Sequence, residues 1–165
     1  MDDKIRQAHH TVYEAEAKAA FRLRLYAAKA EQEGYSQIAK LFRAISRSEE
    51  IHGERSLRAL EPVRDTQANL EASFESETKI AGVAYQKMIQ TASELGDTAA
   101  QTAFSQSRDV EATHARLYKD MLEHLTEERE TTYHVCTVCG FVADGTRPEN
   151  CPVCGVPGNK FIVVE

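Results

Sequence analysis

Glutamate and histidine recur in one arrangement within the first 130 residues. Residues 49–52 read Glu-Glu-Ile-His and residues 111–114 read Glu-Ala-Thr-His, and a glutamate three residues before a histidine projects to the same side of a helix as that histidine. A further glutamate precedes each motif; these two lie 61 residues apart, and the motifs lie 62 apart. The arrangement is therefore an internal repeat. Its candidate ligands are Glu16, Glu49, His52, Glu77, Glu111 and His114.

This set of side chains predicts a metal centre. Glu16 precedes Ala20 by one helical turn, and Glu77 precedes Ala81 in the same way, so both glutamates fall on apolar helix faces. Four carboxylates and two imidazoles in a helical core would be prohibitively costly unless a metal neutralised them. Oxygen-rich ligands with some imidazole suit iron or manganese, and ferritin-like di-iron bundles use this ligand set. The alternative is a group of solvated helices whose Glu–His pairs are ordinary surface residues.

All four cysteines belong to a second candidate site. They form two Cys-x-x-Cys pairs separated by eleven residues, and a glycine follows each pair. Two such pairs complete a tetrahedral tetrathiolate site, and the glycines let backbone amides turn toward the sulfurs. Disulfides are the alternative, although this spacing in a chain of cytosolic character favours a metal. The spacing alone does not decide between iron and zinc. The candidate ligands are Cys136, Cys139, Cys151 and Cys154.

Long helices must position the glutamates and histidines. Residues 1–130 are rich in helix-forming residues, and Gly34, Pro62 and Gly96 divide them. The breakers and the apolar spacing predict helices near 5–31, 36–61, 66–94 and 97–126. Four long amphipathic helices with short connections predict a four-helix bundle.

The composition changes near the polar stretch 126–132. Three of the four prolines, four of the eight glycines and all the cysteines follow it. We therefore predict two domains: an all-α four-helix bundle over 1–130, and a small four-cysteine domain over 131–165.

The charge and hydropathy of the chain exclude several classes of partner. The net charge is −6, which argues against a surface that binds nucleic acid. The apolar runs are far too short to span a membrane, and the charged N-terminus has no apolar segment behind it that would suggest a secretory signal. We expect a cytoplasmic protein that binds neither nucleic acid nor membrane.

The chain resembles rubrerythrin, a ferritin-like di-iron domain over 1–130 followed by a rubredoxin-like domain over 131–165, and the resemblance extends from about residue 10 to the end. The resemblance rests on the sequences of residues 33–39, 41–45 and 48–52, and of 133–136 through 150–155. It implies an oxo-bridged di-iron centre held by the six glutamates and histidines, with Glu49 and Glu111 as the bridging pair. It also implies that Tyr85, eight residues after Glu77, lies beside that centre, and that one iron or zinc ion binds the four cysteines.

The sequence departs from the family at two positions. The family usually has another glutamate three residues after the third-helix ligand, which exchanges with a histidine when the redox state changes; here that residue is Ile80. Leu23 stands where the family has a tyrosine in the first helix. We expect that the six-ligand site is intact and that His52 stays bound in both redox states.

Other polar residues are not expected to bind the metals. Glu14 and Glu75 each precede a proposed ligand by two residues, which places them about 200° around the helix, so we expect them either to be solvated or to contact the ligands without binding metal. His9, His10 and His124 have no acidic partner at a useful spacing, and we expect them at the surface.

The resemblance implies a peroxidase that reduces hydrogen peroxide to water. The tetrathiolate iron would carry single electrons from a donor protein to the di-iron centre, and the family implies a homodimer in which this module serves the partner subunit. Two alternatives stay open: a ferroxidase or iron-handling protein that uses oxygen, and an electron-relay or redox-sensing protein.

Overall fold

The structure is a computed structural model that describes residues 1–60, 63–125 and 130–164. The chain divides into two compact units, Met1–Val63 and Arg64–Glu165. None of the helices within the described ranges is long and apolar enough to cross a membrane.

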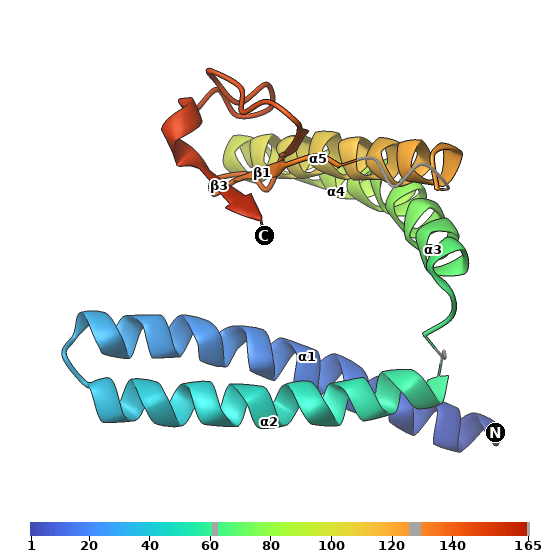
Figure 1. The fold of residues 1–165 in the computed structure, drawn as a ribbon, viewed down its shortest axis with the longest axis vertical. Coiled ribbons are helices and arrows are strands. Elements are labelled where there is room, and N and C mark those ends of the chain that lie inside the picture. The colour runs from blue at the N-terminus through green and yellow to red at the C-terminus, as the bar shows by residue number, and fades with distance from the viewer. Residues whose placement is uncertain (61–62, 126–129, 165) are drawn as a thin grey trace. The chain divides into compact units, whose positions relative to one another are not determined.

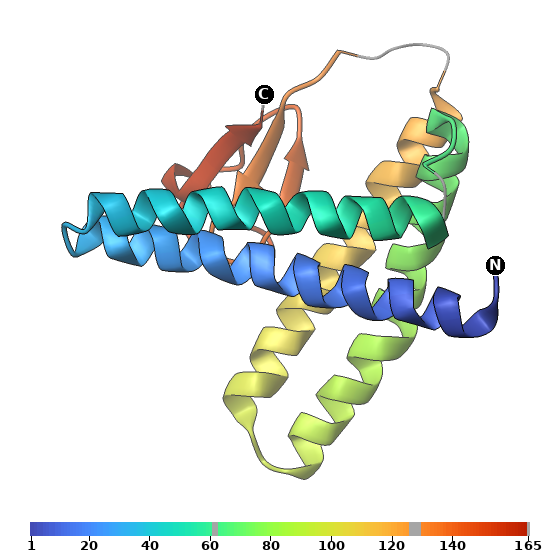
Figure 2. The ribbon, with the colours of Figure 1, turned by 90° about the horizontal axis from the view of Figure 1, so that it is seen from below.

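The first unit is a hairpin of two long helices, α1 (Asp3–Gln32) and α2 (Ser36–Leu60) (Figures 1 and 2). The turn between them contains Gly34, whose φ of 83° is the left-handed conformation that favours glycine. The Tyr35 amide donates to the Ala30 carbonyl at 2.8 Å, and the Gly34 amide donates to the Glu31 carbonyl at 3.0 Å. This pattern ends α1 as a Schellman motif, as the position of the glycine predicts.

Small residues allow α1 and α2 to pack closely. The buried residues of α2 include Ala39, Ser46, Gly53 and Leu60, one at every seventh position. The Ser46 hydroxyl donates to the Ala20 carbonyl at 2.9 Å. A β-carbon at Gly53 would lie only 3.6 Å from Cβ of Glu16. The contact between the two helices therefore runs directly behind a candidate ligand.

The second unit begins with another helical hairpin. Its first arm consists of α3 (Thr66–Lys79), a π-helical segment η1 (Ile80–Ala84) and α4 (Tyr85–Glu94), and its second arm is α5 (Thr98–Glu123). Carboxylates of Asp65 and Asp97 accept from backbone amides and cap the first turns of α3 and α5. The turn at Gly96 repeats the Schellman hydrogen bonds of the first hairpin.

The π-helical segment corrects the prediction of one uninterrupted α-helix over 66–94. A single turn of π-helix accommodates about one extra residue in an α-helix. Eight α-helical residues would place Tyr85 about 80° from Glu77 around the axis, whereas an extra residue reduces the angle to about 20°. The segment thus returns Tyr85 to the helix face of the candidate ligand.

The second unit ends in a three-stranded antiparallel sheet with strand order β2-β1-β3. The strands are β1 (Tyr133–Cys136), β2 (Val142–Asp144) and β3 (Phe161–Val164), and a short 3-10 helix, η2 (Gly158–Lys160), precedes β3. The buried core of this module consists of Cys136, Ala143, Cys151 and Phe161. Residues 126–129, on which the predicted boundary partly rests, lie outside the described residues.

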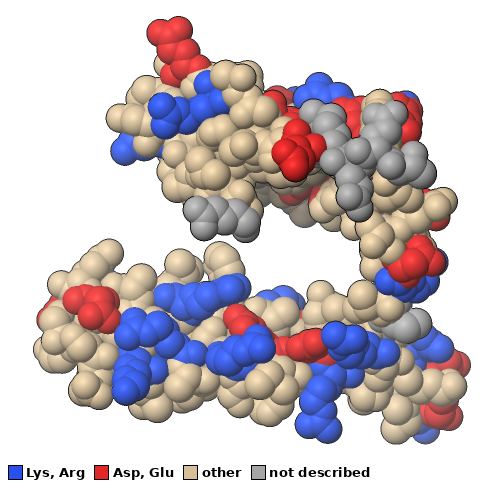
Figure 3. Space-filling view, viewed as in Figure 1, with Lys and Arg blue, Asp and Glu red and all other residues tan. Residues whose placement is uncertain are grey.

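Basic and acidic side chains are mixed along the surface of the first hairpin (Figure 3). Several of them form exposed ion pairs, such as Lys18–Glu14 at 3.3 Å and Arg43–Glu31 at 3.2 Å. Exposed pairs of this kind add little stability.

Candidate metal centres

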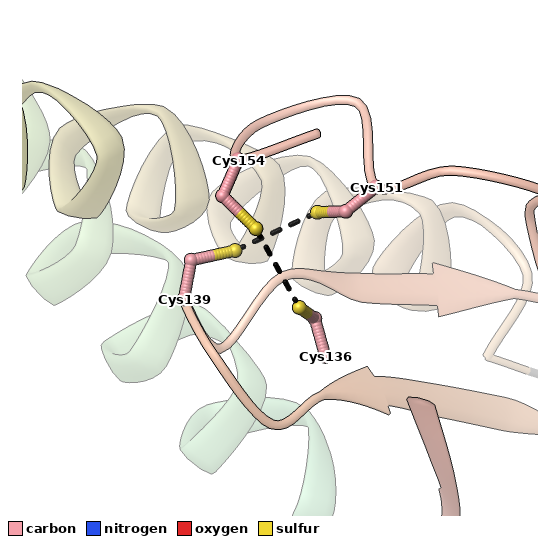
Figure 4. A group of neighbouring side chains, drawn as sticks. All are labelled: Cys136, Cys139, Cys151 and Cys154. Carbon is pink, nitrogen blue, oxygen red and sulfur yellow. Dashed lines mark hydrogen bonds between the residues drawn. The ribbon is translucent and has the colours of Figure 1, made fainter. Parts of the chain in front are cut away.

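The four cysteines of the C-terminal module converge on one point (Figure 4). The Cys136 and Cys154 sulfurs lie 3.8 Å apart, and those of Cys139 and Cys151 lie 3.6 Å apart. A tetrahedral ion with metal–sulfur bonds of about 2.3 Å requires sulfur–sulfur distances of about 3.8 Å. The four free thiols therefore match a tetrathiolate metal site, whereas a disulfide would require about 2.05 Å.

Two similar turns shape this cluster. In the first, the Cys136 amide donates to the Phe141 carbonyl at 2.9 Å, and in the second the Cys151 amide donates to the Val156 carbonyl at 2.8 Å. Gly140 and Gly155 have φ values of 82° and 75°, which a residue with a β-carbon rarely adopts. The glycines after each pair are thus required by the backbone, as the sequence indicates.

The cluster is prepared to release a proton. Burial tends to raise the pKa of the Cys136 thiol, but hydrogen bonds from the Cys139 and Val138 amides and from neighbouring thiols outweigh it, so its pKa falls to about 7. Burial raises the pKa of Cys139 and Cys154. The Cys136 thiolate thus forms readily, whereas a bound cation would favour the loss of the protons from Cys139 and Cys154.

The first hairpin brings together Glu16, Glu49 and His52. Glu16 comes from α1 and the other two from α2, and one ligand atom of each lies within 4.8 Å of the others. His52 Nδ1 lies 3.0 Å from Glu49 Oε2 and 3.8 Å from Glu16 Oε1. Two helices bury only the surface between them, so the His52 side chain is still 49% exposed within this unit.

The second hairpin repeats the cluster with Glu77, Glu111 and His114. Glu77 lies in α3 and the other two lie in α5, again with ligand atoms within 4.8 Å of one another. The distance from His114 Nδ1 to Glu111 Oε2 is 3.0 Å, as in the first hairpin. The two clusters contain all six residues that the sequence repeat predicts.

Each cluster crowds two carboxylates together. The hydrogen bond with Glu49 is the main cause that raises the pKa of Glu16, and burial and the charge of Glu49 add to it. Burial is the main cause that raises the pKa of Glu77, followed by the hydrogen bond with Glu111. A cation bound between two carboxylates removes the repulsion between them and favours their ionised forms, so the donor set fits a metal.

Several other predicted residues have a defined place. Tyr85 is the half-buried first residue of α4, and Ile80 begins the π-helical segment. Glu14 and Glu75 are exposed, as predicted, and so is His10. The prediction for His9 was wrong, because this residue is half-buried in α1 and its Nδ1 lies 3.4 Å from the Ser56 hydroxyl of α2. This pairing depends on the packing of two helices, which the spacing of histidines cannot reveal.

Comparison with known proteins agrees with these two kinds of centre. Residues 10–122 match the family model for rubrerythrin, and residues 134–162 match the model for the rubrerythrin rubredoxin-like domain. Rubrerythrin-2 of Clostridium acetobutylicum is 27% identical, covering 92% of this chain and 91% of the relative. Rubrerythrin of Porphyromonas gingivalis is 29% identical, covering 90% of this chain and 84% of the relative.

Nigerythrin is similar in both sequence and fold. The protein from Nitratidesulfovibrio vulgaris is 27% identical, with 92% of this chain and 77% of the relative covered. A solved structure of partially reduced nigerythrin superposes with a TM-score of 0.60 at 24% identity, covering 96% of this chain and 86% of that one. This likeness confirms the predicted fold class, a helical ferritin-like part with a small rubredoxin-like module.

Proposed function

Because the chain belongs to the rubrerythrin family, whose members are oxidoreductases, we propose that it is a non-haem di-iron peroxidase. Its substrate is hydrogen peroxide, which it reduces to water. The observation that supports this best is the presence of two different metal centres in one chain: two Glu-Glu-His clusters and one tetrathiolate cluster. An oxidoreductase needs a site for chemistry and a supply of electrons, and these centres meet both needs.

The six glutamates and histidines hold the di-iron centre of the family in this proposal. Each hairpin contributes one Glu-Glu-His cluster, and Glu49 and Glu111 serve as the bridging pair. When bound, the two irons supply the two electrons that break the O–O bond of peroxide. The protein supplies four carboxylates that balance the charge of the metals, and Tyr85 lies beside the site.

The four cysteines hold the iron that delivers electrons. The module that carries them contacts α5 within the second unit: a β-carbon at Gly140 would lie 3.9 Å from Cγ1 of Val110. Gly140 follows the ligand Cys139, and Val110 precedes the proposed ligand Glu111. This contact supports electron transfer from the cysteine cluster to a site that includes Glu111 of the same chain, whereas the resemblance implies transfer to the partner subunit. A donor protein supplies the electrons to the cluster, and the location is the cytoplasm.

The partner in the proposed homodimer is a second copy of this chain, as the family resemblance implies.

Exposed apolar side chains on the first hairpin provide a face on which other helices of the proposed bundle would pack. Ile38 and Ile45 precede His52 by fourteen and seven residues on the ligand-bearing face of α2, and they are 47% and 38% exposed. A stable bundle requires another pair of helices to cover this face.

The test is the reaction of the fully reduced protein with each oxidant under anaerobic stopped flow. We expect hydrogen peroxide to oxidise the di-iron centre much faster than oxygen does. Faster oxidation by oxygen would instead indicate iron handling, and slow reaction with both would indicate an electron relay. Elemental analysis should find about three metals per chain, of which the double variant C136S/C151S loses one and keeps two.

A further inference from the structure

A cleft of about 330 Å³ opens beside the ligand cluster of the first hairpin. One wall comes from α1 and the other from α2, and two proposed iron ligands, Glu16 and His52, form part of its lining. A water molecule takes up about 30 Å³ in the liquid, so the cleft has room for hydrogen peroxide and several waters. Its remaining lining residues are His9, Val12, Arg55 and Ser56.

The corresponding cleft on the second hairpin is apolar. It has a volume of about 380 Å³ and lies beside His114. The repeat offset of 61 residues that relates Glu16 to Glu77 also relates His9 to Leu70. The offset of 62 that relates Glu49 to Glu111 relates Ser56 to Tyr118 and Arg55 to Leu117. Leu70, Leu117 and Tyr118 all line this second cleft. The two halves of the repeat thus keep the same ligands but differ in the residues around them.

The polar cleft contains a histidine that is held in place. His9 lies seven residues before Glu16 on α1, and Ser56 lies four residues after His52 on α2, so both follow the ligand rows of their helices. The Ser56 side chain is buried, and its hydroxyl lies 3.4 Å from His9 Nδ1. This pairing occupies one ring nitrogen and leaves Nε2 available to a molecule in the cleft.

We propose that His9, oriented by Ser56, donates a proton to hydrogen peroxide that enters through this cleft. The inference rests on the proposed peroxidase function. Peroxide takes up two electrons, one from each ferrous iron, and two protons; the O–O bond breaks and both oxygen atoms leave as water. His9 Nε2 gives one of these protons to the departing oxygen, and solvent in the cleft returns it. His9 is then a catalytic residue, and Ser56 is a positioning residue.

The chemistry of the two clefts explains why the first one serves this step. General acid catalysis requires a donor within hydrogen-bond reach of the reacting atom and contributes about 10²- to 10⁴-fold to a rate. The polar cleft offers an imidazole, a guanidinium and a hydroxyl near its metal ligands. Leucines and a tyrosine fill the equivalent positions of the other cleft. Peroxide is therefore expected to react from the side of the first hairpin.

The experiment compares His9→Gln with His10→Gln, the same change at the exposed neighbouring residue. We expect the second-order rate of oxidation by peroxide to fall at least tenfold in H9Q and to stay within twofold in H10Q. S56A should lose part of the rate, whereas Y118F, which removes the hydroxyl at the equivalent position of the second hairpin, should keep it. Added imidazole should restore the rate of a His9→Gly variant.

Two further measurements distinguish a proton donor from a structural residue. Iron content should be unchanged in H9Q, and azide, used as a probe, should bind the oxidised protein at least tenfold more weakly in H9Q than in H10Q. An unchanged rate in H9Q, a loss of iron from it, or no rescue by imidazole would overturn the assignment of His9. If the natural protein itself reacts slowly with peroxide, the proposed peroxidase function is wrong, whatever the variants show.

Discussion

Individual carboxylates have sharply different roles although they are close in sequence. Glu49 lies 3.0 Å from His52 within the first cluster, whereas Glu14 points to solvent and pairs with Lys18. We predict that Glu49→Ala empties the bundle of iron, because a bridging carboxylate serves both metals, and that Glu111→Ala does the same. Metal analysis should show the loss, with Glu14→Ala as the control that keeps its iron. Loss of iron from E14A but not from a Glu16→Ala variant would mean that the wrong helix face has been assigned.

Crowded carboxylates also make the metal-free protein sensitive to pH. The folded state raises the pKa of Glu77 above its ordinary value, so folding favours the protonated form. The resulting contribution to the free energy of unfolding is fully present below the ordinary pKa of a glutamate, near 4.3. It is lost as the pH rises through the raised pKa that Glu77 has in the folded state. We predict that Glu77→Gln raises the melting temperature of the iron-free protein by about 2–4 °C at pH 7 and has little effect at pH 4. Parallel pH curves for the two proteins would contradict this prediction.

Ile80 takes the place of a carboxylate that could have changed the potential of the centre. A buried negative charge about 5 Å from the metals is worth about 3 kcal/mol at most, with an effective dielectric constant near 20. We predict that Ile80→Glu lowers the midpoint potential in a redox titration. Val83→Glu, in the same π-helical segment and 49% exposed, should change the potential less. Crystals in both redox states should show His52 bound throughout in the natural protein, and a metal that moves by more than about 1 Å with release of His52 would disprove this.

Helices show how far sequence can predict structure. Gly34 and Gly96 correctly mark two turns, because a left-handed residue at a helix end has a clear signature. The spacing of the glutamates and histidines likewise identifies the residues that each hairpin brings together. The π-helical segment Ile80–Ala84 could not be predicted. One additional residue within a helix does not change the helix propensities of the sequence. His9 was misassigned for a related reason: its partner Ser56 is distant in sequence and is brought near only by the packing of α1 on α2.

The π-helical segment gives a prediction for a whole element. A β-carbon at Gly82 would meet no atom within 4 Å, so Gly82→Ala should stabilise the helix by about 0.5–1 kcal/mol. Deleting Gly82 should instead remove the extra residue and convert the segment to α-helix, which keeps Tyr85 about 20° from Glu77 and leaves the orientation of α4 unchanged. We expect thermal unfolding at a higher temperature for G82A and at a temperature close to that of the natural protein for the deletion. A clearly lower melting temperature for the deletion would show that the π-helical segment does more than accommodate one extra residue.

At the scale of the whole molecule, a homodimer in which each site took one hairpin from each chain would let two inactive chains repair each other. Glu49→Ala disables the first hairpin and Glu111→Ala disables the second. With sites of that kind, each mixed dimer formed when these variants are refolded together should contain one site built from two intact hairpins. About a quarter of the natural di-iron content should return for random pairing, measured by metal analysis and absorption. A mixture of Glu49→Ala with Glu16→Ala, both altered in the first hairpin, should recover none. Recovery absent from both mixtures would place each site within a single chain.

The low pKa of Cys136 bears on the order in which the protein must be matured in the cell. With a pKa of about 7, this thiol is partly thiolate at neutral pH before any metal arrives, and thiolates are the form that peroxide oxidises to sulfenic acid. Its burial slows that damage, but one oxidised sulfur would leave only three ligands for the ion. A newly made chain is thus vulnerable to its own proposed substrate, and metal insertion into the C-terminal module must come before oxidative stress. A cell that is exposed to peroxide under iron limitation would gain little from synthesising more of this protein.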